Sequence, residues 1–405
     1  SNQALSPVEA VKRGHFNESI IAGPLIMKHI PPYNGFEQGP IRPPSESESL
    51  LIRITRNCPW NRCTFCPVYK DAEFSLRPLE HVLNDIDTVK AYVDGIVEAR
   101  QSGARYYGDF IKDGVDDEMA LHAAYHFVAG GMKSIFLQDG NSLIIKPEEI
   151  ITILRHLQQS FPMVKRITSY ARSHTIARIS DDNLEKMAKA GLNRIHIGME
   201  SGSDRVLKMV KKGVDKATQI RAGQKVKRAG IQLSEYFMPG LGGESLSREH
   251  ALESAAALNQ INPDFIRLRS LALPMAAPLT AQFEAGEFDK MGEVATTSEL
   301  LLFLESLQGI TSKVRSDHVL NLFSEVNGTL PADQQKMTDP LRRFLELDAE
   351  EKMIFCLGRR THRLSRLEDL KNPELRDPVA KMCAEHGATE DNMDQIIQSI
   401  MQRFI

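Results

Sequence analysis

Three of the five cysteines in the 405-residue chain, Cys58, Cys63 and Cys66, lie within one short segment. Their spacing is C-x(4)-C-x(2)-C, and Asn57 and Asn61 give the segment turn chemistry. Thiolates that one loop brings together are good ligands for a metal. A closed structural zinc site usually has four protein ligands, so three cysteines favour an iron–sulfur cluster with one iron left open. A zinc knuckle, or three unrelated thiols, is the alternative.

The residues before the cysteines must position them. Residues 50–55 are apolar or β-branched except for Arg53, which predicts a buried strand that ends where the cysteine loop begins. Similar apolar runs recur along the chain, separated by segments of helical periodicity, at 134–138, 164–170, 194–199, 231–238 and 265–271. This alternation predicts a parallel sheet with right-handed crossovers. In such folds the chemistry lies at the carboxyl ends of the strands.

The cysteine segment resembles the cluster loop of the radical S-adenosylmethionine (radical SAM) enzymes, which usually reads C-x(3)-C-x-aromatic-C. Phe65 stands at the aromatic position. The first gap holds four residues instead of three, and we expect the extra residue to bulge outward without moving the sulfurs. The resemblance covers residues 48–275. It implies a partial (β/α)6 TIM-like barrel, a [4Fe–4S] cluster on the three cysteines, and SAM bound at the open iron.

The same resemblance assigns residues that would contact SAM. Gln138, Asp139 and Gly140 occupy the place of the family's motif after the second strand, which receives the methionine amine. They depart from its usual Gly-Gly-Glu pattern. An ammonium group needs acceptors, so we expect Asp139 to be the amine acceptor.

Residues 198–213 look closest to the subgroup that includes methylthiotransferases, oxygen-independent coproporphyrinogen oxidases and cobalamin-dependent relatives. This similarity implies that Glu200 accepts from the ribose hydroxyls, with Ser201 beside it, and that Lys212 meets the SAM carboxylate. A solvated helix end is the alternative for Lys212. Residues 237–245 match the glycine motif after the fifth strand, whose bare backbone at Gly240 and Gly242 would run along the adenine and ribose.

Four further polar residues are candidates for binding the substrate. Arg267 and Arg269 are two residues apart on the sixth strand, so both should face into the barrel, where guanidinium groups suit a carboxylate or phosphate. Pairing with neighbouring acids is the alternative. Tyr170 and Arg172, just past the third strand, are similar candidates.

Composition narrows the function. A net charge of −3 counts against a chain built to bind nucleic acid, although the segment 359–371 is basic. No D-x-H-x-x-G motif is present, so we expect no cobalamin.

We therefore predict an enzyme that reductively cleaves SAM and uses the 5′-deoxyadenosyl radical to abstract hydrogen from a small or medium organic substrate. A reducing protein such as flavodoxin or ferredoxin would supply the electron. The alternatives are a radical SAM enzyme that modifies RNA or a protein, and a zinc-containing nucleic-acid-binding protein.

Three regions are expected: an extended arm at 1–47, the barrel at 48–275, and an all-helical domain at 276–405. The last shows helical periodicity at 300–307, 317–323, 340–355 and 391–404, and holds Cys356 and Cys383 as expected buried structural residues. The apolar runs are too short to cross a bilayer, and we expect no secretory signal. Bunched, metal-binding cysteines indicate a reducing compartment, so we predict a cytoplasmic enzyme.

Overall fold

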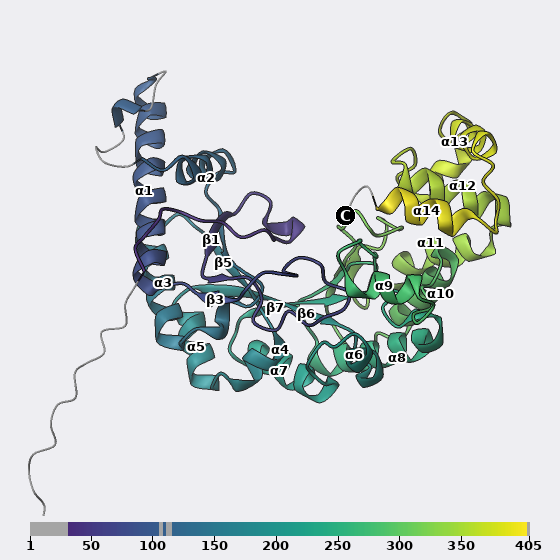
Figure 1. Ribbon diagram of the computed structural model, residues 1–405, viewed down its shortest axis with the longest axis horizontal. Helices are drawn as coiled ribbons and strands as arrows, with labels where there is room; N and C mark the ends of the chain where they lie inside the picture. The colour runs from purple at the N-terminus through teal and green to yellow at the C-terminus, as the bar shows by residue number, and fades with distance from the viewer. Residues whose placement is uncertain (1–30, 105–107, 111–115, 403–405) are drawn as a thin grey trace, which may run out of the picture. The chain divides into compact units, whose positions relative to one another are not determined.

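Parallel strands in the order β1-β4-β5-β6-β7-β8 form the centre of the fold, as the alternating pattern predicts (Figure 1). The computed structural model describes residues 31–104, 108–110 and 116–402, so most of the predicted arm lies outside the described residues. The predicted mixed α/β fold with a radical SAM-type barrel is confirmed. The strands are β1 (Leu50–Arg53), β4 (Ser134–Gln138), β5 (Arg166–Ala171), β6 (Leu192–Glu200), β7 (Gln232–Phe237) and β8 (Phe265–Leu268).

Helices connect successive strands and cover the outer side of the sheet (Figure 1). Local signals set where they begin: the Ser180 side chain caps α5 and the Asp215 side chain caps α7 by accepting backbone N–H bonds. Gly103, with a φ of 72°, ends the long helix α1 in the left-handed conformation that glycine adopts readily. The helices of this part are α1 (Leu79–Ser102), α2 (Glu118–Ala129), α3 (Pro147–Ser160), α4 (Ser173–Arg178), α5 (Asp181–Lys189), α6 (Asp204–Met209), α7 (Lys216–Arg228) and α8 (Gly243–Ile261).

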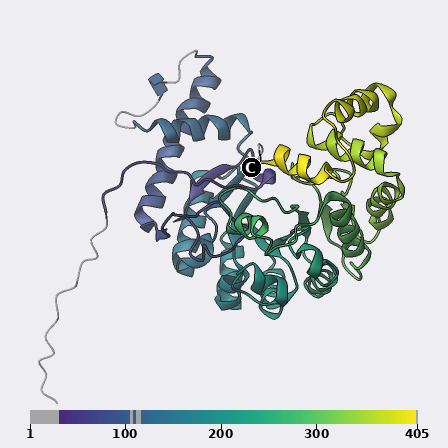
Figure 2. The ribbon, with the colours of Figure 1, turned by 45° about the vertical axis from the view of Figure 1, so that its right-hand side comes forward.

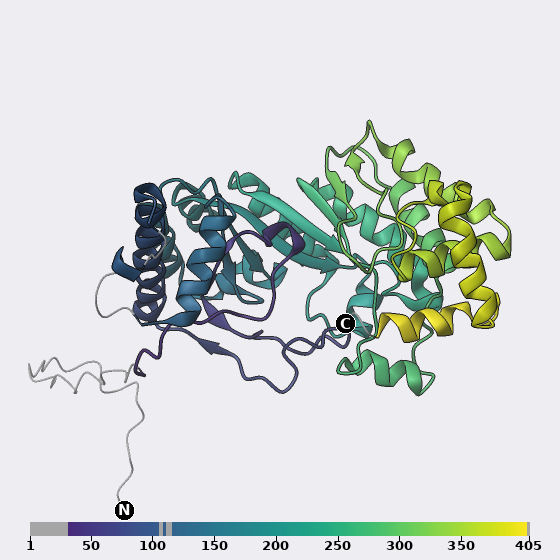
Figure 3. The same ribbon diagram turned by 90° about the horizontal axis from the view of Figure 1, so that it is seen from above.

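Beyond residue 275 the helices gather beside α8 (Figures 2 and 3). Except for the first, they pack around an apolar core that includes Phe303, Phe344 and Phe355, while Leu279 of the first packs with Leu273 and Phe288. Cys356 and Cys383 are buried in that core, as predicted. These helices are α9 (Pro278–Glu284), α10 (Glu293–Glu305), α11 (Gln334–Glu346), α12 (Ala349–Arg360), α13 (Pro373–Glu385) and α14 (Met393–Met401).

The C-terminal segment is not all helical, which corrects the prediction. β9 (Lys313–Arg315) pairs in parallel with β8, and β10 (Gly328–Thr329) pairs antiparallel with β9. Residues 317–323, expected to be helical, form a loop, because Asn321 hydrogen-bonds the backbone of the segment after β8 instead of supporting a helix. The domain boundary predicted at 275 stays a prediction. No division of the chain is seen there, because Gly35–Ile405 form one compact unit and the sheet continues past residue 275.

Candidate functional site

The cysteine loop, residues 57–74, is closed at its base by a short antiparallel ladder. β2 (Thr55–Arg56) leads into the loop and β3 (Ser75–Leu76) leaves it. The amide of Asn57 donates to the carbonyl of Glu73 across the base. Asn57 has a φ of 66°, a left-handed conformation that asparagine tolerates better than most residues. The ladder and this bond hold the ends of the loop together.

Two side chains brace the interior of the loop. The Asn61 amide donates to the carbonyl of Tyr69. The Lys70 ammonium donates to the carbonyls of Asn61 and Cys63, at 2.9 and 3.1 Å. The turn residues seen in the sequence therefore fix the path of the chain around the thiols.

All three loop cysteines line one cavity of about 640 Å³ and are partly exposed. Burial raises the pKa of Cys63, while the nearby charges of Lys212 and Arg172 act in the opposite direction and favour a thiolate. Thiols that face one cavity beside two cations fit a [4Fe–4S] cluster held by Cys58, Cys63 and Cys66. In the described part of the chain, no group of three or more His, Cys, Asp or Glu is arranged to hold a single metal ion.

The longer first gap of the cysteine motif has a docking partner. Trp60, within that gap, donates from Nε1 to the carbonyl of Lys211 at 2.7 Å. Its ring also lies under the guanidinium of Arg172, 4.9 Å from the ring centroid. A side chain at Gly213 would collide with the Trp60 ring. The extra residue thus fastens the cysteine loop to the turn after α6.

Glu200 and Lys212 form an ion pair in the cavity wall that keeps only slight exposure to solvent. A bulge at the end of β6 puts Glu200 at a φ of 64°, and its Oε1 lies 3.3 Å from Lys212 Nζ. Burial disfavours the charge of Lys212, but Glu200 and Cys63 outweigh it and raise the pKa of Lys212. Both side chains are only 12% exposed, so Lys212 is not a solvated helix end. Its Nζ lies 5.5 Å from the ring centroid of Phe65, and Gly198 leaves the room that the pair needs.

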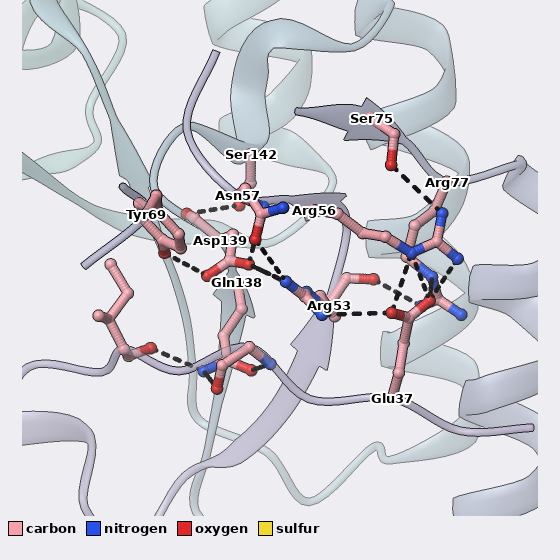
Figure 4. A network of polar contacts seen from close by, with 12 residues as sticks. Glu37, Arg53, Arg56, Asn57, Tyr69, Ser75, Arg77, Gln138, Asp139 and Ser142 are labelled. Carbon is pink, nitrogen blue, oxygen red and sulfur yellow. Dashed lines mark hydrogen bonds and ion pairs between the residues drawn. The ribbon is translucent and has the colours of Figure 1, made fainter. Parts of the chain in front are cut away.

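Asp139 lies behind the cavity wall, where its carboxylate is fully engaged (Figure 4). Tyr69 Oη donates to Oδ1 at 2.5 Å, while Oδ2 accepts from Arg53 Nε at 2.9 Å and from the backbone N–H of Asn57 at 3.2 Å. The residue is fully buried and does not line the cavity. This geometry does not support the predicted role as amine acceptor and makes Asp139 an anchor of the cysteine loop.

Gln138 holds the segment that we call the strap, residues 38–44. Its side chain accepts from the N–H of Gly39 at 2.9 Å and donates to the carbonyls of Gly39 and Ile41, at 3.2 and 2.6 Å. All seven strap residues line the cavity, together with Gly140. Gln138 therefore positions a wall of the cavity through backbone contacts.

The residues predicted along the adenine and ribose serve mainly to support the loops there. Ser201 is fully buried and hydrogen-bonds His250 Nδ1 at 2.8 Å, so it does not lie beside Glu200 in the cavity wall. The N–H of Gly240 donates to Glu299 Oε1 at 2.7 Å. Burial raises the pKa of Glu299 to about 7. Neither Gly240 nor Gly242 lines the cavity, although Met238, before them, does.

The candidate substrate residues divide into two groups. Tyr170, Arg172 and Arg269 line the cavity. Arg267 is buried outside it, where Nη1 lies 2.5 Å from Asp317 and Nε donates to Ser234. The alternative of pairing with a neighbouring acid is therefore correct for Arg267 alone.

Sequence reasoning missed several parts of the cavity wall, among them the strap, Tyr236 and His318. His318 lies in the loop that was expected to be helical. Asn321 donates to the carbonyl of Leu268 and holds the loop against β8, while Ser316 closes the loop internally by donating to the carbonyl of Phe323. A pair of short polar residues so close together in an apolar segment was the available signal for a loop.

A family model for the radical SAM superfamily matches residues 52–255, half of the chain. The chain therefore belongs to this superfamily and is an enzyme of the radical SAM class, whose cofactors are a [4Fe–4S] cluster and SAM.

Two curated relatives are named for tRNA modification. The chain is 23% identical over 243 residues to a tRNA uridine(34) acetyltransferase from Methanocaldococcus infernus, a match that covers 57% of this chain and 44% of the relative. It is 25% identical over 212 residues to a tRNA-2-methylthio-N(6)-dimethylallyladenosine synthase from Vesicomyosocius okutanii, covering 50% and 39%. The chain thus spans less than half the length of these relatives.

Solved structures with a similar fold include methylornithine synthase (PylB), at 14% identity and a TM-score of 0.41, with 67% of this chain and 66% of that chain covered. Another is the cobalamin-dependent SAM radical enzyme OxsB with aqua-cobalamin and SAM bound, also at 14% and 0.41, with 88% and 54% covered.

These comparisons correct the predicted partners. The prediction that nucleic acid is an unlikely partner is wrong, because the relatives include enzymes named for tRNA. The expected absence of cobalamin stays a prediction, because the cobalamin-dependent OxsB resembles this chain only at a TM-score of 0.41. None of the helices in the described part of the chain is both long enough and apolar enough to cross a bilayer.

Proposed function

We propose that this enzyme modifies a nucleoside within an RNA substrate. The observation that carries the proposal is that one cavity is lined both by the three cysteine thiols with the Glu200–Lys212 pair and by Tyr170, Tyr236 and Arg269. The relatives named for tRNA modification support RNA as the substrate class.

The first set of residues would hold the cofactors. The three thiols would ligate the cluster, Glu200 would accept from the ribose hydroxyls of SAM, and Lys212 would face its carboxylate. When bound, the cluster and SAM supply one-electron cleavage of SAM and a carbon radical that removes hydrogen from the substrate. The chain's own task is to position the substrate and to exclude water and other hydrogen donors. Exposed thiols of this kind also favour a reducing, cytoplasmic location.

The cavity suits a single nucleoside better than a double-stranded RNA helix. Its volume of about 640 Å³ is typical of small-molecule and cofactor sites, and the cluster, SAM and the reacting group of the substrate would share it. A base inside a duplex would have to leave its stack to enter, so an unpaired loop or end is the expected target. Tyr170 and Tyr236 offer aromatic faces at the cavity on which such a base could stack.

The test uses anaerobically reconstituted enzyme with dithionite and SAM. Its host's RNA is the candidate substrate, and a filtrate of small molecules from the same cells is the comparison. We expect RNA to increase the formation of 5′-deoxyadenosine and to carry a new nucleoside mass after digestion. Cys63→Ala enzyme is the control and should give neither result. Stimulation by the filtrate alone, with unchanged RNA nucleosides, would reject this function and favour the small organic substrate that the sequence suggested.

A further inference from the structure

Arg269 differs from its neighbour on the same strand face. It follows β8, is largely exposed, and lines the cavity. Its backbone N–H donates to the carbonyl of Phe237 at 3.1 Å, which fixes the main chain at this point. No acceptor in the described part of the chain hydrogen-bonds its guanidinium, whereas that of Arg267 is paired with Asp317. Arg269 therefore lines the cavity on a fixed main chain, with a guanidinium whose donors no described residue engages.

His318 lines the same cavity from the loop after β9. Its Nδ1 accepts the backbone N–H of Leu320 at 3.2 Å, so the neutral ring carries its proton on Nε2. Burial and the nearby charge of Arg269 lower the pKa of His318 to about 4, although Asp317 acts in the opposite direction. At neutral pH His318 is thus a neutral donor beside a cation.

The other charges of the cavity do not neutralise Arg269. Among the described residues that line the cavity, Glu200 is the one with a carboxylate, and this carboxylate is paired with Lys212. The hydroxyls of Tyr170 and Tyr236 stay protonated, because burial raises the pKa of Tyr236 to about 12 and also raises that of Tyr170. Both interact electrostatically with Arg269, so they lie near it without supplying a negative charge.

We propose that Arg269 and His318 form an oxyanion subsite that binds a phosphate or carboxylate group of the substrate. A guanidinium supplies two parallel donors to such a group, and the imidazole supplies a third. In an RNA substrate the group is the phosphate of the target nucleotide. That assignment rests on the proposed function, whereas the subsite itself rests on the unpaired guanidinium and the oriented ring.

The experiment measures binding by calorimetry to cluster-loaded enzyme with SAM present. The probes are the ribonucleoside 5′-monophosphates, the matching nucleosides, and succinate. We expect at least one monophosphate to bind more tightly than its nucleoside. Arg269→Gln should weaken that monophosphate about ten- to hundredfold and leave the nucleoside unchanged. His318→Phe, which removes the donor but keeps a ring, should weaken it about two- to tenfold, and His318→Gln should restore part of the loss.

Arg248→Gln is the matched control, because Arg248 is exposed on α8 and does not line the cavity. It removes the same charge and should change no affinity. Succinate binding that is lost in Arg269→Gln, without a preference for any monophosphate, would keep the subsite and reject RNA as the substrate. Equal anion affinities in Arg269→Gln and the unmodified enzyme would overturn the subsite. So would a loss of SAM affinity in Arg269→Gln, since it would assign the guanidinium to the cofactor.

Discussion

The cavity wall and the layer packed behind it contain the same charged groups in different states. Glu200 and Arg269 line the cavity. Glu200 has a single ion-pair partner, Lys212, whereas no residue in the described structure bonds the guanidinium of Arg269. Asp139 and Arg267 carry the same charges behind the wall, where neighbouring side chains satisfy them. The comparison teaches that neighbouring segments decide whether a charged residue at a strand end is fully satisfied or keeps the capacity for further hydrogen bonds.

The largest contrast is expected between the two sets of cysteines. Cys63→Ala should abolish iron incorporation and reductive SAM cleavage, because a cluster with only two protein sulfurs is not held. Cys356→Ala should leave both intact, since Cys356 is buried in the C-terminal core. Iron content after reconstitution measures the effect, with about four irons expected per chain in Cys356→Ala. Loss of iron in Cys356→Ala would show that the division between cavity and core is wrong.

Asp139→Asn tests whether the carboxylate behind the wall is structural. It removes the charge that faces Arg53 and the acceptor of Tyr69, and breaking a buried, hydrogen-bonded ion pair costs about 3–5 kcal/mol. We expect that fall in the free energy of unfolding, measured by urea titration of the enzyme without its cluster. Unchanged stability together with weakened SAM binding would return Asp139 to the role of amine acceptor.

Glu299 provides a pH test of the same layer. Its pKa is raised from 4.5 to about 7, so the native state holds this proton more tightly than the unfolded chain does. The free energy of unfolding should therefore fall as pH rises from about 4.5 to about 7, by about 3 kcal/mol in all, and stay low above that range. Glu299→Gln keeps an acceptor for Gly240 and should lack this fall. Urea titrations at pH 5 and pH 8 compare the two proteins, and parallel pH profiles would contradict the assignment.

Glu200→Gln sharpens the comparison from the cavity side. Its main effect should be on SAM affinity, which we expect to fall about ten- to hundredfold through loss of a charged acceptor. Its effect on stability should be smaller than that of Asp139→Asn, because Glu200 has one ion-pair partner and is partly exposed. Calorimetric titration with SAM measures the first quantity and urea titration the second. If Glu200→Gln unfolds more easily than Asp139→Asn but binds SAM normally, Glu200 is the structural carboxylate and Asp139 is the one that binds the cofactor.

The strands and the cysteine loop could be predicted because they depend on local patterns. Continuous apolar runs such as 134–138 identify buried parallel strands without knowledge of their neighbours. Glu200 and Lys212 were reachable through the family resemblance. The role of Asp139 was not, since it depends on Arg53 and Tyr69, which only the folded chain brings to it. His318 was missed for a similar reason. The spacing of apolar residues at 317–323 suggested a helix, whereas the bonds from Asn321 to Leu268 and from Ser316 to Phe323 hold this segment as a loop.

The strap has one more consequence. Gln138 holds it entirely through main-chain groups, so closure of this side does not depend on which side chains the strap carries. Exchange of Gln38 or Arg42, which line the cavity, should therefore leave the polypeptide path in place. Gly39 between them is fixed, because a side chain there would collide with the Asp139 carboxylate. The strap thus places two replaceable cavity residues on either side of a position that tolerates glycine alone.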